Sequence, residues 1–140
     1  MNLYNKYLLN KKKYNEYVIL IESGIFIEVF DRDAIIINKL LDYKLISNNN
    51  RLRLGFPSRI INKVTIELNI NHINYIVIDS NNNVKIKKKY KDNNYNKYIK
   101  EYKSLYEIDN RINIIYNRLN SKRKDNNINN ILSKIEEVLN

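Results

Sequence analysis

Cysteine is absent from this 140-residue chain, and glycine and proline are rare, with two copies and one copy. Without cysteine the chain has no disulfides, no thiolate metal ligands and no cysteine nucleophile. The phosphate-binding pattern G-x-x-x-x-G-K-[ST] is also missing. The single histidine, His72, has no acidic or histidine partner at ligand spacing, which argues against a metal site. We therefore expect neither enzymatic activity nor a cofactor.

Long hydrophobic runs are missing as well. The longest, Tyr17–Ile21, is too short to cross a bilayer, and no basic segment followed by an apolar one opens the chain. We expect a cytoplasmic protein with no membrane partner. Apolar residues nevertheless make up 44% of the sequence, which argues against disorder. The length suits one domain, or one domain with a helical appendage.

Positive charge is in excess, with 25 Lys and Arg against 15 Asp and Glu. Residues 1–80 hold eleven basic and eight acidic side chains (net +3), whereas residues 81–140 hold fourteen and seven (net +7). Such an excess is typical of proteins that bind nucleic acid or an anionic surface. Part of it has a plainer origin, because lysine has A/T-rich codons, like the abundant Asn, Ile and Tyr. We interpret Lys11–Lys13 as the solvated face of a helix and the lysines of 85–91 as protection of an edge strand.

The spacing of apolar residues predicts alternating helices and strands over the first two thirds of the chain. Asp31 or Asp33 is expected to cap a helix, Gly24 to turn a hairpin, and Gly55 and Pro57 to end a strand. The predicted helices cover 3–14, 34–41 and 57–72. The predicted strands cover 17–22, 25–30, 45–46, 52–54, 74–79 and, at the sheet edge, 84–89.

Beyond Tyr90 the pattern is helical throughout. Apolar residues recur at steps of three and four in two stripes, which are Leu105, Ile108, Ile112, Ile115 and Leu119, then Ile128, Ile131, Ile135 and Val138. We predict an α/β (α+β) fold with a small mixed sheet flanked by helices over residues 1–90, and a helical hairpin extension over residues 91–140. The two stripes either pack onto the body or contact another chain, as a homodimer or with a partner protein.

The order of these elements resembles the N-terminal mismatch-recognition domain, domain I, of the MutS DNA mismatch repair family. The resemblance covers about residues 4–89. All of the chain's glycine, alanine and proline fall within it, at Gly24, Ala34, Gly55 and Pro57. It depends on the order and spacing of the segments YLLNKKKYNEYVIL, GIFIE followed by VF, DRDA, KLLDYKL and GFP.

The resemblance implies binding of mismatched or distorted duplex DNA. In the family the phenylalanine of the GIFIE-like signature enters the duplex from the minor groove beside a mispaired base, and the glutamate two positions later hydrogen-bonds that base. These roles would fall to Phe26 and Glu28. Alternate residues of a strand share a face, so Phe26 and Glu28 point together, and Ile25, Ile27 and Val29 are expected in the opposite layer.

Arg51, Arg53 and Arg59 are the basic residues that we expect to position the DNA backbone. Two departures from the family pattern favour an alternative. Ile27 replaces an aromatic residue, and Glu22 replaces a basic one and would repel a phosphate. We therefore weigh two functions, a stand-alone DNA-binding module and a diverged copy of the fold that mediates protein interaction or dimerisation without mismatch recognition. The nucleotidase domain of the family has no counterpart in this sequence.

Overall fold

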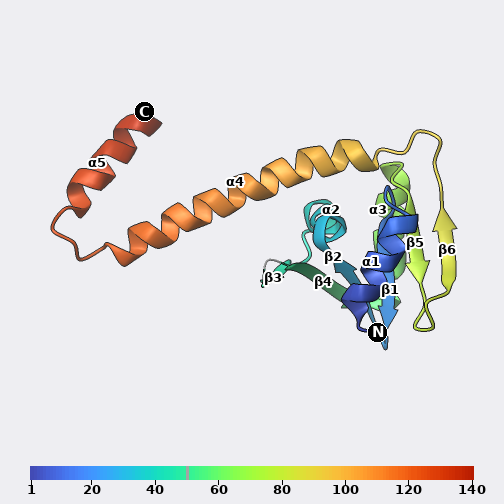
Figure 1. Cartoon of the computed structure of the whole chain (residues 1–140). Coiled ribbons are helices and arrows are strands. Elements are labelled where there is room, and N and C mark those ends of the chain that lie inside the picture. Colours follow the sequence, from blue (N-terminus) through green and yellow to red (C-terminus); the bar gives the residue numbers. More distant parts are fainter. Residues whose placement is uncertain (50) are drawn as a thin grey trace. The chain divides into compact units, whose positions relative to one another are not determined.

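The computed structural model describes residues 1–49 and 51–140 (Figure 1). The helices of the described part are α1 (Leu3–Lys13), α2 (Asp31–Leu41), the 3-10 turn η1 (Ser58–Ile60), α3 (Ile61–Ile70), α4 (Tyr95–Ser121) and α5 (Ile128–Leu139). The strands are β1 (Val18–Ser23), β2 (Phe26–Phe30), β3 (Ile46–Asn48), β4 (Arg51–Pro57), β5 (Tyr75–Ile78) and β6 (Val84–Lys88).

The strands form one sheet in the order β3-β4-β2-β1-β5-β6. β1 and β5 run parallel, and the other neighbouring pairs run antiparallel. The predicted class, a small mixed sheet flanked by helices, is therefore confirmed. The lysine-rich strand β6 lies at one edge, as expected.

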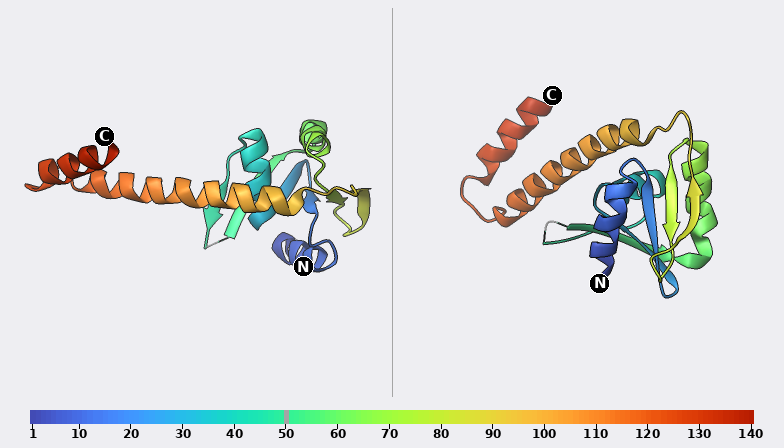
Figure 2. Two further views of the ribbon diagram at one scale, coloured as in Figure 1. Left: turned by 90° about the horizontal axis from the view of Figure 1, so that it is seen from above. Right: turned by 45° about the vertical axis from the view of Figure 1, so that its right-hand side comes forward.

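Helices cover both faces of this sheet (Figure 2). α1 packs on one face, where Tyr7 contacts apolar residues of β1 and β5 together with Phe30. α2, α3 and the beginning of α4 pack on the other face, against a larger core that includes Ile27 and Val29. β1 and β5 are thus buried on both faces, which explains why their sequences are continuous apolar runs and do not alternate.

A two-residue turn of Gly24 and Ile25 joins β1 to β2, since Ser23 pairs with Phe26. Gly24 has φ +59°, a conformation that side chains with a Cβ rarely adopt. The prediction that Ile25 faces the core is wrong, because Ile25 belongs to the turn and is 74% exposed. Ile27 and Val29, inside the strand, are fully buried as predicted.

Two further local predictions are wrong. The side chains of Asp31 and Asp33 do not cap α2, which begins at Asp31 after the extended residue Phe30. Gly55 does not end a strand, because β4 continues through it and pairs with β2 from Arg53 to Pro57, whereas Pro57 does stand at the end of β4 as predicted. Pro57 is tolerated as the last strand residue, where η1 follows.

The chain divides into two compact units, Met1–Lys103 and Ser104–Asn140. The first extends past residue 90, because Tyr95 is completely buried and Tyr98 and Tyr102 pack against the core. The second contains α5 and the part of α4 that begins at Ser104, with their apolar side chains largely exposed. None of the helices formed by the described residues combines the length and apolar character that a membrane crossing requires.

Candidate nucleic-acid interface

An open groove of about 1060 Å³ lies on the sheet face that carries α1. α1 covers β1 and β5 on this face, so β2, β4 and β3 beside them stay accessible and form the floor, and the first residues of α1 form a wall. Alternation along β2 and β4 selects the floor residues, which are Phe26, Glu28 and Phe30 from β2, and Arg51, Arg53 and Gly55 from β4.

Phe26 stands at the end of the groove that is next to the Gly24–Ile25 turn. It is 46% exposed, although Phe30, four residues later on the same face, is buried against α1. The difference follows from position, because Phe26 lies beyond the region of the sheet that α1 covers. An aromatic ring at a strand end with half its surface in solvent is accessible to a nucleic-acid base.

Glu28 is held in the middle of the groove by an ion pair. Arg53 Nε donates to Glu28 Oε2 at 2.9 Å. The Glu28 side chain is only 13% exposed, since it lies over the backbone of Gly55, its register partner on β4. A Cβ at position 55 would come within 3.1–3.3 Å of three carboxylate atoms. The hydrogen bond that Arg53 donates to Glu28 raises the pKa of Arg53.

Arg51 lies in the same groove and uses a different contact. Its guanidinium carbon is 4.2 Å from the centre of the Tyr4 ring, in a cation–π arrangement. The Tyr4 hydroxyl donates to Asp31 at 2.7 Å, and this hydrogen bond raises the pKa of Tyr4. With Lys44, the groove has three basic residues and one carboxylate, Glu28, among its lining.

The structure brings four of the five predicted site residues together along the groove, namely Phe26, Glu28, Arg51 and Arg53. Arg59 is exposed in η1, two residues after Pro57, which pairs with Phe26, and it does not line the groove. Among the described residues no group of three histidine, aspartate or glutamate side chains is placed to hold a metal ion.

Glu22, which the sequence marked as unfavourable for DNA, has a basic partner. Lys85 Nζ of the edge strand β6 contacts Glu22 Oε1 at 2.7 Å, and the hydrogen bond with Glu22 raises the pKa of Lys85. Further along β6, Lys87 lies over the Tyr14 and Tyr17 rings. The charge of Glu22 is therefore partly compensated on this face.

The positive charge belongs almost entirely to the first compact unit. Residues 1–103 hold nineteen Lys and Arg against ten Asp and Glu (net +9), and residues 104–140 hold six against five (net +1). The greater basicity of residues 81–140 thus comes from β6, the segment that follows it and the first turns of α4. The charge pattern that suits nucleic acid coincides with the unit that contains the groove.

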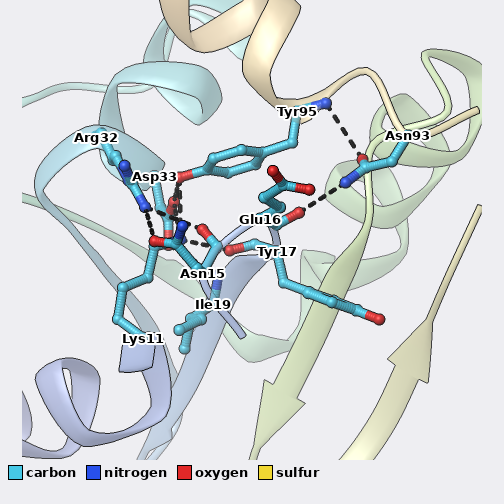
Figure 3. A network of polar contacts seen from close by, with 9 residues as sticks. All are labelled: Lys11, Asn15, Glu16, Tyr17, Ile19, Arg32, Asp33, Asn93 and Tyr95. Atoms are coloured by element: carbon cyan, nitrogen blue, oxygen red, sulfur yellow. Dashed lines mark hydrogen bonds and ion pairs between the residues drawn. The ribbon is translucent and has the colours of Figure 1, made fainter. Parts of the chain in front are cut away.

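A buried polar cluster at the beginning of β1 was not predicted from the sequence. Lys11 Nζ lies 2.8 and 3.0 Å from the two carboxylate oxygens of Asp33 and also donates to the Tyr17 carbonyl and the Tyr95 hydroxyl. Asp33 accepts further hydrogen bonds from the Ile19 amide and the Tyr95 hydroxyl. Figure 3 shows Lys11, Asp33 and Tyr95 pointing toward one another from α1, α2 and α4. The interpretation of Lys11 as a solvated residue is wrong.

Burial dominates the electrostatics of this cluster. It raises the pKa of Asp33 and lowers the pKa of Lys11, while their mutual attraction opposes both shifts. Burial also raises the pKa of Tyr95, and the nearby Asp33 charge adds to that shift. With no exposed surface on Asp33, the cluster serves to fix α1 and α4 to the segment that follows β2.

Comparison with known proteins supports these observations. Residues 2–104 match MutS domain I, so the chain belongs to this family. The match includes both strands that form the centre of the groove and ends next to the boundary of the first compact unit at Lys103. No curated protein matches the chain. The family suggests a DNA-binding domain related to mismatch repair.

Proposed function

We propose that this protein binds mismatched or distorted duplex DNA, with Phe26 entering the base stack and Glu28 contacting the displaced base. The observation that carries the proposal is the exposed Phe26 ring beside Glu28 in a groove that also presents three basic residues. Opening a base step for an aromatic side chain costs a few kcal/mol, and costs less where pairing is already defective. The preference for a mismatch would therefore come from easier deformation of the DNA.

The basic residues would supply affinity that does not depend on sequence. Lys44, Arg51 and Arg53 line the groove, and Arg59 extends the positive surface near the turn. Each neutralised phosphate contributes about −0.9 to the slope of log K against log salt concentration. Four such contacts predict a slope of about −3 to −4, and an affinity in the micromolar range or weaker at physiological salt.

Fluorescence anisotropy with two labelled duplexes tests this proposal. The duplexes have the same sequence except for one mispaired base, and each is titrated at two salt concentrations. We expect tighter binding of the mismatched duplex, and Phe26→Ala should abolish that preference while retaining salt-dependent binding. Ile25→Ala is the matched control, because it removes an exposed apolar side chain from the adjacent turn. Equal binding of both duplexes by the wild type, or an unchanged preference in Phe26→Ala, would refute the proposal.

A second candidate function is self-association through the C-terminal helices. Residues 104–140 are close to neutral, and the exposed large apolar side chains of α4 and α5 include Ile108, Ile112, Ile115, Leu132 and Val138. A neutral apolar surface suits protein contact better than DNA contact, and we propose a second copy of this chain as the occupant.

Light scattering after gel filtration, over a range of protein concentrations, tests the dimer. The double variant Ile112→Asp/Ile115→Asp should be monomeric, whereas Asn113→Asp, which adds a charge at a polar position between them, should leave the mass unchanged. A wild type that stays monomeric at every concentration would exclude the dimer. The DNA titration separates the two functions, because a dimer without mismatch recognition binds both duplexes equally.

A further inference from the structure

We infer that Arg53 determines the specificity of the groove by positioning and neutralising Glu28. This inference rests on the proposed DNA binding and assigns Arg53 a role other than simple attraction of phosphates. Arg53 pairs in register with Phe30, so its side chain reaches diagonally along the sheet face to Glu28, two residues away on β2. The contact is a hydrogen-bonded ion pair at 2.9 Å.

Gly55 makes this geometry possible. The carboxylate of Glu28 occupies the space that a Cβ at position 55 would need, with the closest approach at 3.1 Å. Glu28 is thereby confined between the backbone of β4 and the guanidinium of Arg53. A side chain held in this way contacts a base in one orientation, which is what discrimination between bases requires.

The ion pair also removes an electrostatic obstacle. A lone carboxylate in the centre of a DNA-binding groove repels the phosphate backbone of every duplex, matched or mismatched. Arg53 cancels that charge through Nε, and its guanidinium has four further N–H donors with which it can bind a phosphate. Arg53 is half exposed, so phosphate can reach it. Arg53 then links the DNA backbone to the Glu28 carboxylate, which contacts the base.

Arg51 provides a matched comparison on the same strand. It lies two residues before Arg53 in the same groove, and its guanidinium stacks on Tyr4. Arg51→Gln and Arg53→Gln each remove one positive charge from the groove, but only Arg53→Gln removes the partner of Glu28. If both arginines act only by attracting phosphates, the two variants should change DNA affinity in the same way. If Arg53 also positions and neutralises Glu28, the two variants should differ.

The experiment measures the affinities of Arg51→Gln, Arg53→Gln and Glu28→Gln for mismatched and matched duplexes at two salt concentrations. Arg51→Gln should weaken both complexes alike and keep the ratio of the two affinities within about twofold. Arg53→Gln should lower that ratio by about fivefold or more. In the double variant Arg53→Gln/Glu28→Gln, affinity for the matched duplex should recover relative to Arg53→Gln, because the unpaired carboxylate is gone. An Arg53→Gln variant that behaves like Arg51→Gln would overturn the inference.

A measurement on the free protein separates this inference from the proposed function. The Nε–H resonance of Arg53 in an NMR spectrum should move in Glu28→Gln and stay in place in Glu22→Gln, which removes a carboxylate paired with Lys85. If the wild type shows no mismatch preference but the resonance responds to Glu28→Gln, the proposed function fails and the ion pair stands. If the preference exists and the resonance is unaffected, the role of Arg53 is overturned and the proposed function stands.

Discussion

Replacing Asp33 with alanine should destabilise the fold more than any single change in the groove. The substitution leaves the ammonium group of Lys11, the Tyr95 hydroxyl and the Ile19 amide without their shared acceptor. The Lys11 and Asp33 side chains are 11% and 0% exposed, so water replaces the lost contacts poorly. Breaking a buried ion pair by removing one partner costs about 3–5 kcal/mol. A domain of this size has only about 5–15 kcal/mol of total stability.

Urea unfolding followed by circular dichroism measures this cost. Asp33→Ala should lower the unfolding midpoint by about 1–3 M at an unchanged slope. Lys12→Met is the control for the lysine run, because Lys12 is exposed and its replacement should change stability by less than about 0.5 kcal/mol. A loss below about 1 kcal/mol in Asp33→Ala would contradict the buried ion pair.

A double variant tests the balance between burial and attraction. Burial raises the pKa of Asp33, so the folded state favours the protonated carboxyl group. The stability that this preference contributes is fully present below the ordinary pKa of aspartate and is lost as pH rises through the folded-state pKa. Burial lowers the pKa of Lys11, so the folded state favours the neutral amine. The stability that this preference contributes is fully present at high pH and is lost as pH falls through the folded-state pKa. At neutral pH both charges are therefore costly to bury. Lys11→Met/Asp33→Asn should lose less stability than the sum of the single variants; additive losses would refute the coupling.

Three further outcomes are expected. Gly55→Ala should displace Glu28, because the added Cβ would lie 3.1 Å from its carboxylate, and should lower mismatch preference without unfolding the protein in circular dichroism. Gly24→Ala, at φ +59°, should cost about 1 kcal/mol in urea unfolding, and a neutral result would contradict the turn geometry. Phe26→Ala should change the free energy of unfolding by less than about 1 kcal/mol, because the Phe26 side chain is exposed. A larger loss would show that Phe26 belongs to the core.

The sequence was sufficient to predict that Phe26 and Glu28 lie together in the groove, because their arrangement depends on local geometry. The turn at Gly24 and the alternation along β2 place Phe26 and Glu28 on one face whatever the rest of the chain does. The error at Ile25 has the same local origin, because a one-residue difference in where the strand begins moves a side chain from the core to the solvent.

The contact partners of Lys11 could not be predicted from local geometry in the same way. Lys11 stands in a run of three lysines that is typical of a solvated helix face, and its contacts Asp33 and Tyr95 lie 22 and 84 residues further along the chain. The signal in the sequence is Asp33 itself, which directly precedes the apolar run Ala34–Ile37 but which helix-capping rules also explain. Separation in sequence hides such contacts, since charge patterning describes only neighbours along a helix.

The amino-acid sequence by itself determined the order of helices and strands, the family, and the shared face of Phe26 and Glu28, because periodicity and turn chemistry act over a few residues. Only the tertiary structure decided that α1 leaves half of one sheet face open, that Arg53 and not Arg51 pairs with Glu28, and that Gly55 makes room for the carboxylate. Strand register and helix placement, which depend on packing between distant segments, decide these contacts.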